Sequence, residues 1–263
     1  MTTESTTVLD LNQMIRRLLI ACVIIQLTLL LADYVINYLD IFEERGMRRI
    51  FNIAREQSIP SWFSSIQAQL LGVTVLTIAM VQRGQIPRWR TIAWFAAGLF
   101  FLWVGIDDYA ELHEKLGGAV NRMAEAGDNT QLTETLLANP SFNWHSFIAP
   151  IYALFCLGVL ALAGPEFWRR GLWPWMLFGF GCWAVSQAID FVEGMDVAED
   201  IYDWAQATFG IERRYGVTHT AKLIEEMLEM FGTTLLWIGF LHYLAALLQQ
   251  RSLRFVYHPT GRS

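Results

Sequence analysis

The hydrophobic residues of this chain gather in long, nearly unbroken runs. Six such runs are present, and each is close to the roughly 20 residues that a helix needs to cross a bilayer. Runs of this length favour helices over the strands of a membrane barrel, in which apolar and polar residues alternate. The sequence therefore predicts an all-α, polytopic membrane helix bundle that forms one transmembrane domain over residues 1–263, with spans at about 18–39, 62–82, 91–108, 146–164, 172–192 and 227–248.

The connection at about 40–59 has a different pattern. Apolar Ile50, Phe51 and Ile53 alternate there with arginines, which is typical of an amphipathic helix lying on the membrane surface. At the end of the first span, Asp33 and Tyr34 occupy the place where a signal peptide would have small residues. We therefore expect the first run to be a retained span.

Arginine predicts the orientation of the spans, because cytoplasmic connections of membrane proteins are rich in Lys and Arg. Four arginine groups fall on one side if the chain has six spans with both termini inside (N-in/C-in): 16–17, 83–90, 169–170 and 251–262. One outer connection, which holds Arg45, Arg48, Arg49 and Arg55, runs against this bias. The bias as a whole still favours the N-in/C-in arrangement.

Composition narrows the class of protein. Of the 263 residues, 54% are hydrophobic and 17% are charged, whereas soluble domains carry roughly 25% charged residues. The net charge of −6 argues against a nucleic-acid partner. We expect a multi-pass protein of the bacterial cytoplasmic (inner) membrane whose partners are membrane lipids, with other membrane helices or a second copy of the chain as further candidates.

Acidic residues collect at the predicted outer ends of three spans. Helical geometry predicts that Asp107, Glu111 and Glu114 share one face, because they are spaced i, i+4, i+7. Acids at such spacings recur where the fifth span finishes, with Asp190 and Glu193 at i, i+3, and where the sixth begins, with Glu225 and Glu229 at i, i+4. The candidate metal ligands are Asp107, Asp108, Glu111, His113, Glu114, Glu193, Glu226 and Glu229, and the candidate catalytic groups are Glu114, Glu225 and Asp190.

Such a set of acids requires compensation, because like charges repel and each acid at membrane depth costs roughly 2.5–3.5 kcal/mol. A bound divalent cation would compensate, and so would protonation; acids that simply face water at helix ends are the alternative. Oxygen ligands suit Mg or Ca, and an added histidine widens the choice to Mn, Fe or Zn. The pattern lacks the paired Glu-x-x-His motifs of di-iron bundles.

Other polar residues have two interpretations each. His145 and His219 are further ligand candidates or interfacial polar residues, and Asp33 either joins the outer acids or reaches the surface. His242 is predicted to be an interhelical hydrogen-bond partner or an inner-interface residue. Cys22, Cys156 and Cys182 all lie in apolar runs and are predicted to be packing residues.

Four motifs carry a resemblance: SIPSWFSS, LHEKLG, FVEG and LIEEMLEMFG. With them, the chain from about Ser58 to Tyr243 resembles a widespread family of uncharacterised bacterial multi-span membrane proteins. The resemblance implies that the family pattern includes His113, Glu114, Glu193, Glu225, Glu226 and Glu229. That pattern has Asp-Glu ahead of Leu-His-Glu, whereas this chain has Asp107 and Asp108. The resemblance implies no activity.

Three functions fit these observations. The first is a membrane-embedded, metal-dependent enzyme that acts on a lipid or lipid-linked group, with metal-activated water and a carboxylate that moves protons. The second is a proton or cation transporter, which the scarcity of polar residues in the predicted inner halves of the fourth and sixth spans disfavours. The third is a non-catalytic accessory or metal-binding membrane subunit.

Overall fold

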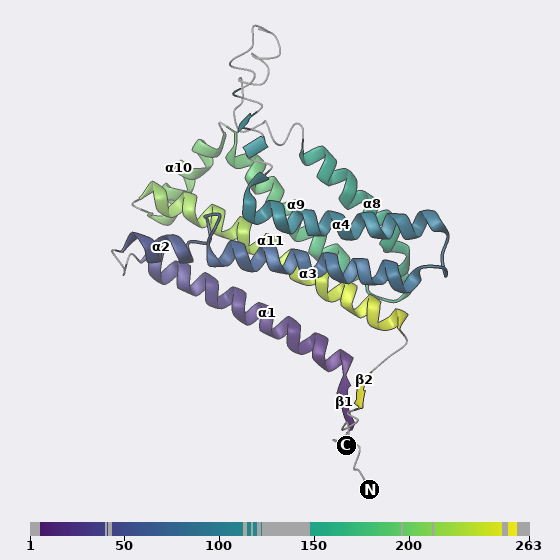
Figure 1. Cartoon of the computed structure of the whole chain (residues 1–263). Helices are drawn as coiled ribbons and strands as arrows, with labels where there is room; N and C mark the ends of the chain where they lie inside the picture. The colour runs from purple at the N-terminus through teal and green to yellow at the C-terminus, as the bar shows by residue number, and fades with distance from the viewer. Residues whose placement is uncertain are drawn as a thin grey trace, which may run out of the picture.

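The computed structural model describes residues 6–39, 41, 44–112, 115–116, 118–119, 122, 148–195, 197–211, 213–248 and 252–256. These residues form a bundle of helices (Figure 1). Six helices are long and apolar enough to cross a membrane. They are α1 (Leu11–Asp33, continued by the π-helix η1, Tyr34–Tyr38), α3 (Ile59–Gln82), α4 (Arg88–Ala110), α8 (Ala149–Arg169), α9 (Trp173–Glu193) and α11 (Arg214–Leu247). The predicted all-α polytopic bundle is confirmed.

The helices overlap the six predicted spans, and the largest difference is at α11. This helix has 34 residues and begins at Arg214, well before the predicted start at 227. At 1.5 Å per residue it is about 51 Å long, compared with about 30 Å for the hydrocarbon core of a bilayer. Its first turns carry His219, Lys222, Glu225 and Glu226, and they bring these polar side chains to the bundle as part of the same helix.

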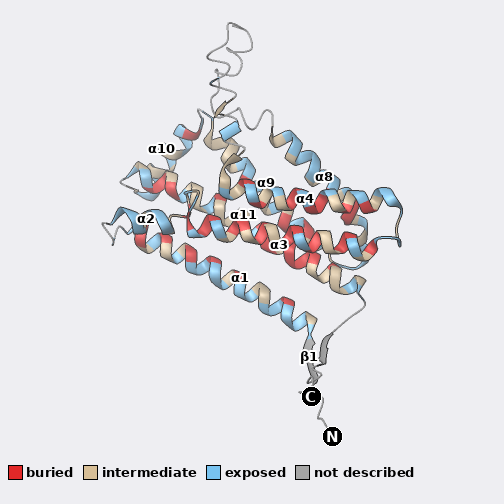
Figure 2. Ribbon diagram, in the orientation of Figure 1, coloured by how far each residue is buried: buried red, intermediate tan, exposed pale blue. Residues whose placement is uncertain are grey.

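Close helix packing defines one part of the bundle, formed by α1, α3, α4 and α11. A Cβ atom on Gly72 or Gly98 would come within 2.9 Å of atoms of the facing helix, so these two glycines let α3 and α4 approach closely. Large side chains, among them Trp94, Phe101 and Phe240, fill the space between these helices. Figure 2 shows the buried residues concentrated along α3, α4 and α11.

Helices α8 and α9 form the opposite flank, and α8 is mostly exposed (Figure 2). Close approaches join α9 to α11 at Gly179 and Gly232, and again at Gly239, which lies beside Trp175. Gly158 and Gly164 on α8 and Gly181 on α9 instead face open space. In a chain that spans a membrane, the apolar exposed faces of these two helices are available to lipid.

Both ends of the described chain lie on one side of the bundle (Figure 1). Strand β1 (Thr6–Asp10) pairs antiparallel with β2 (Ser252–Val256), and Asp10 then accepts hydrogen bonds from the first backbone amides of α1. An even number of spans has its termini on the same side, as here. The strands were not predicted, and the assignment of this side to the cytoplasm stays a prediction.

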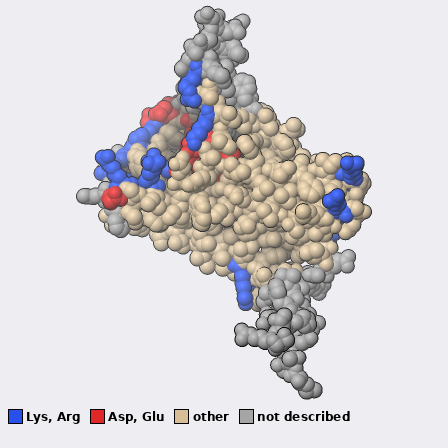
Figure 3. Space-filling model, in the orientation of Figure 1, with Lys and Arg blue, Asp and Glu red and all other residues tan. Residues whose placement is uncertain are grey.

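Two short helices lie at the other end: α2 (Arg45–Phe51) and α10 (Val197–Phe209). Glu44 caps α2, and the bonds from the backbone amides of Met47 and Gly46 lower its pKa. Helix α2 covers only part of the amphipathic segment predicted at 40–59, because the chain turns inward after Phe51 and buries Ile53 almost completely. Basic and acidic residues are both visible at this end, whereas the α3–α4 turn at the opposite end shows only basic ones among the described residues (Figure 3).

Candidate functional site

A cavity of about 800 Å³ lies between α4, α8, α9 and α11, next to the beginning of α3. It is within the size range of pockets for small-molecule ligands. One end of its lining is polar and the rest is apolar. Six of the acids predicted to gather at the outer ends of the spans line the polar end: Asp107, Asp108, Asp190, Glu225, Glu226 and Glu229.

A seventh carboxylate comes from Glu56, just ahead of α3. Its Oε2 accepts a hydrogen bond from the Ser61 hydroxyl at 3.1 Å. Nothing in the spacing of residues separates Glu56 from the other charges of the 40–59 segment, and only the inward turn of the chain after α2 places it in the cavity. Lys222 is the one basic residue among the lining residues described by the structure, so carboxylates predominate at this end.

Lys222 connects the acids of two helices. Its Nζ donates a hydrogen bond to Glu225 Oε1 at 2.7 Å, and it lies 3.8 Å from Asp190 Oδ1 and 3.9 Å from Glu226 Oε1. The spacing of Lys222, Glu225 and Glu226 on α11 brings all three to one side of the helix. One ammonium group therefore faces three carboxylates.

Polar groups of α9 hold Glu229. The Ser186 hydroxyl donates to Glu229 Oε1 at 2.8 Å, and Gln187 Nε2 donates to the same atom at 3.0 Å. The close approach of the two helices at their facing glycines makes these short contacts possible. Among the described residues, the groups that hold Glu229 are thus neutral donors.

Asp107 is held from α8. The Tyr152 hydroxyl donates to Asp107 Oδ2 at 2.5 Å and accepts a bond from Trp103 Nε1 at 2.7 Å. Asp107 is only 2% exposed. The Tyr152 hydroxyl was not predicted as part of the site, because a single tyrosine in an apolar span gives no spacing signal that relates it to an acid on another helix.

Two carboxylate oxygens of the cavity lining are buried without a hydrogen-bond partner in the described structure: Asp108 Oδ2 and Glu225 Oε2. Glu225 is 3% exposed. Asp108 lies close enough to Glu56 and Glu229 for their charges to repel it, and Glu226 is repelled by the same two residues. A buried oxygen without a partner is costly, so this end of the cavity is prepared to receive a positively charged or hydrogen-bond-donating group.

Most of the remaining lining is apolar. Phe100 and Val104 of α4, Leu157 and Leu160 of α8 and Phe180 of α9 contribute to it. Cys156 also lies there, as a free thiol in an apolar setting. The cavity therefore extends from the acid-bearing helix ends toward the middle of the spans.

Four of the predicted site residues are not found in the cavity lining. His113 and Glu114 lie outside the described residues. Glu111 is not on the regular face shared with Asp107, because α4 ends at Ala110 and Glu111 has a left-handed backbone with φ 53°. Its carboxylate lies 3.7 Å from Lys115 Nζ.

Glu193 is the fourth. It is half-buried beside α10, where it forms a hydrogen bond with Tyr202. Burial raises the pKa of Tyr202, and the neighbouring carboxylate of Glu193 raises it further. The Tyr202 hydroxyl therefore stays protonated and acts as the donor in this contact between α9 and α10.

Metal binding was the specific chemistry predicted for these acids. Among the residues described by the structure, no group of three or more His, Cys, Asp or Glu side chains is arranged to hold a metal ion. The described acids point to one cavity but do not form a ligand set within it. His113 and Glu114 lie outside the described residues. A metal site here would therefore need these two residues as additional ligands.

Asp33 follows neither of its two predicted alternatives, because it is fully buried against His219. Its Oδ2 lies 2.7 Å from His219 Nε2, and its Oδ1 accepts bonds from Asn37 Nδ2 and the Ile53 amide, both at 3.0 Å. The pair joins α1, the segment after α2, and α11. His219 is therefore a buried partner of Asp33 and does not line the cavity.

The other histidines contribute less. His242 is half-buried and its ring lies 5.8 Å from that of Trp175, between α11 and α9. His145 lies outside the described residues.

The chain matches, over residues 17–244, the family described as "Domain of unknown function (DUF8692)". It belongs to this family. The matched range of DUF8692 contains all seven carboxylates of the cavity and the Asp33–His219 pair. No curated protein and no solved structure matches the chain. The predicted membership of an uncharacterised family is confirmed, and the function of this DUF8692 chain has to be argued from its site.

Proposed function

We propose that this multi-pass membrane protein binds an amphiphile with a cationic head group, such as an amine-bearing lipid or lipid-linked group. The head group occupies the carboxylate end of the cavity and the hydrocarbon chain lies along its apolar wall. We place the protein in the bacterial inner membrane, with the carboxylate end toward the outer face. The observation that carries the proposal is a single cavity that joins buried, unpartnered carboxylate oxygens to an apolar wall.

Charge supports the cationic head group. Seven carboxylates and one lysine line the cavity, and removing acids from water is costly unless they are paired. The Glu225 carboxylate already has Lys222 on Oε1, while its buried Oε2 is without a partner. An ammonium group has three donors and no acceptor, so it fits such oxygens better than a hydroxyl or a phosphate does.

The apolar wall supports a hydrocarbon chain. Much of it comes from α8 and α9, the two long helices with the fewest buried residues (Figure 2). Small lining residues, among them Ala153, Ala184 and Ala188, leave room beside the larger rings. A chain in this space would replace lipid contacts with protein contacts and would place the head group at the depth of the acids.

A titration of purified protein in detergent with dodecylamine tests the proposal, with dodecanol and dodecanoate as probes of equal chain length. We expect dodecylamine to bind at least about ten-fold more tightly than dodecanol, since hydrogen bonds to charged groups contribute about 1.5–3 kcal/mol. Glu225→Gln keeps the shape of the side chain and removes its charge, so it should weaken amine binding about ten-fold. Asp200→Asn, an exposed residue of α10 that is outside the cavity lining, is the matched control and should leave the affinity unchanged.

Equal affinities for dodecylamine and dodecanol would contradict the cationic specificity. An Asp200→Asn effect as large as that of Glu225→Gln would show that the amine responds only to the general negative charge of this face. Either result would remove the proposal.

The second candidate is the metal-dependent enzyme that acts on a lipid. The observation in its favour is the excess of carboxylates over bases at the polar end of the cavity, which a divalent cation would also offset. The described residues do not form a ligand set, so the candidate depends on His113 and Glu114. Elemental analysis decides it: stoichiometric metal that is lost in a Glu114→Ala, Glu229→Ala variant would favour the enzyme over simple amphiphile binding.

A further inference from the structure

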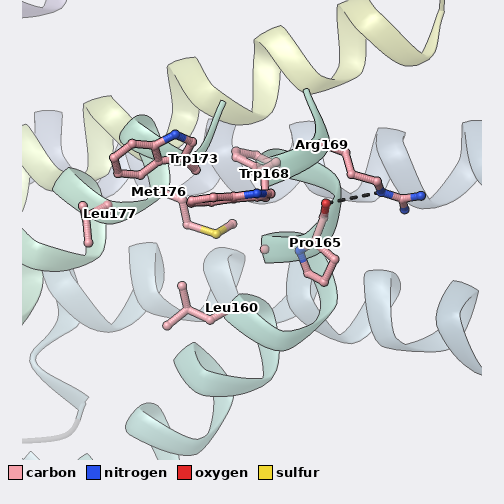
Figure 4. A pocket seen from close by; sticks show the side chains of 9 residues that line it. Leu160, Pro165, Trp168, Arg169, Trp173, Met176 and Leu177 are labelled. Atoms are coloured by element: carbon pink, nitrogen blue, oxygen red, sulfur yellow. Dashed lines mark hydrogen bonds between the residues drawn. The ribbon is translucent and has the colours of Figure 1, made fainter. Parts of the chain in front are cut away.

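A second crevice lies at the opposite end of α8 and α9, where a short turn joins the two helices. Its volume is about 540 Å³ (Figure 4). All but one of its lining residues are apolar: Leu160, Gly164, Pro165, Phe167, Trp168, Trp173, Met176 and Leu177. The exception is Arg169, whose guanidinium points away from the crevice floor in Figure 4.

Two tryptophans mark the depth of this crevice. Trp168 and Trp173 have ring centroids 5.6 Å apart, and both are exposed. Indole rings concentrate at the level of the lipid head groups, whereas Leu160 and Leu177 lie farther along their helices toward the hydrocarbon core. The crevice therefore extends from the head-group level into the acyl-chain region.

Basic residues predominate around the end of α8, and of these Arg169 lines the crevice. Arg169 and Arg170 end α8, and Arg90 approaches from α4. Glu166 lies 2.5 Å from Arg169 and 3.5 Å from Arg90, so one carboxylate is shared by two guanidinium groups. Arg170 instead lies over the ring of Tyr243 at 5.4 Å. The positive charge around the end of α8 is therefore only partly balanced.

We propose that this crevice binds one acyl chain of an anionic phospholipid, with the phosphate against Arg169 and Arg170. The charge complementarity selects an anionic lipid over a neutral one, and the apolar walls select a chain over a free phosphate. The arginine bias predicts that this face is cytoplasmic, and that leaflet is the one enriched in anionic lipids. The proposal is independent of the amphiphile proposed for the carboxylate cavity.

Gly164 offers a direct way to close the crevice. It lines the crevice, and a Cβ atom there would meet nothing within 4 Å. A leucine at this position therefore fills the space without displacing the surrounding backbone. Gly158 on the same helix also faces open space but does not line the crevice, so Gly158→Leu is the matched control.

The experiment is a titration of delipidated, detergent-purified full-length protein with palmitoyl-oleoyl phosphatidylglycerol or phosphatidylcholine, with bound lipid counted by native mass spectrometry. We expect the protein to bind one phosphatidylglycerol molecule tightly and to bind phosphatidylcholine more weakly. Arg169→Gln and Arg170→Gln should each lower phosphatidylglycerol affinity about five-fold, whereas Arg17→Gln, an exposed arginine of α1 that is predicted to lie on the same face, should not. Gly164→Leu should abolish the tight binding and Gly158→Leu should preserve it.

Three results would overturn the proposal. The first is equal affinity for phosphatidylglycerol and phosphatidylcholine. The second is a Gly164→Leu variant that binds phosphatidylglycerol as tightly as the wild type. The third is a loss of phosphatidylglycerol affinity in Arg17→Gln as large as the losses in Arg169→Gln and Arg170→Gln. Because the arginine and glycine variants act on different parts of the lipid, a folding failure in one of them leaves the other as a test.

Discussion

Helix α11 divides the molecule into two regions with opposite properties. On the side that faces α1 and α3, which we call the closed region, polar side chains of α11 bond to side chains of those helices. Thr234 accepts hydrogen bonds from Gln26 at 2.8 Å and from Gln67 at 2.7 Å, and it donates one to the Met230 carbonyl. Toward α8 and α9, it contributes four of the residues that line the carboxylate end of the cavity: Lys222, Glu225, Glu226 and Glu229.

The difference shows how one amphipathic helix can combine stability with binding. In the closed region, polar side chains such as Gln26, Gln67 and Thr234 bond to one another across helices. In the cavity, carboxylates outnumber bases, and two of their buried oxygens have no partner among the described residues. Unfavourable contacts of this kind are typical of sites that a ligand completes. Mutations should therefore destabilise the protein in the closed region and change binding in the cavity.

The largest effect is expected at the Asp33–His219 pair, which belongs to the closed region. Asp33→Ala leaves His219, the Ile53 amide and Asn37 without their common acceptor, and should lower the free energy of unfolding by about 3–5 kcal/mol. The measurement is reversible unfolding in mixed detergent micelles. In the Asp33→Ala, His219→Ala double variant, the loss of unfolding free energy should be much smaller than the sum of the losses in the two single variants. If the two losses simply add, the two side chains do not stabilise the protein as a pair.

Helix packing provides the next contrast. Gly98→Leu inserts a side chain where a Cβ atom would already lie 2.7 Å from Leu76, so it should cost about 1–3 kcal/mol. Gly181→Leu makes the same change on α9, where a Cβ atom meets nothing within 4 Å, and should be neutral. Thermal unfolding of both variants in one detergent measures the difference. Equal losses would mean that the two flanks pack alike.

A smaller effect is expected from Thr234→Val. The change keeps the shape of the side chain but removes the hydroxyl that accepts from two glutamines, and interhelical hydrogen bonds of this kind are worth about 0.6–1.7 kcal/mol. Thr28→Val is the control, because the exposed Thr28 bonds only to the carbonyl of Ile24 on its own helix in the described structure. The same unfolding assay should separate the two variants.

The smallest effect should have the opposite sign. Glu226→Gln relieves the repulsion with Glu229, three residues away on α11, and should raise the free energy of unfolding by about 0.2–0.5 kcal/mol. A stabilised variant would support the view that the cavity acids are placed for binding. Destabilisation by 1 kcal/mol or more would instead place Glu226 among the structural polar groups of the closed region.

The candidate site was only partly predictable. Helical spacing related Glu225 to Glu229, and both line one cavity with Asp107 and Asp190, since each acid lies at the same end of its helix. It failed for Glu111, where the helix ends, and it could not find Glu56 or Tyr152. These last two reach the cavity through a turn of the backbone and through a neighbouring helix, and neither is visible in the spacing of residues along the chain.

The sequence by itself determined the number and approximate length of the membrane helices, because hydrophobic runs must match the thickness of a bilayer. It also determined that acids collect at one end of the bundle, because position along a helix fixes depth. Only the tertiary structure decided which acids share a cavity and which are satisfied elsewhere. Rotation and spacing of the helices set those partnerships, and both depend on contacts between residues far apart in the chain, as in the pairing of Asp33 with His219.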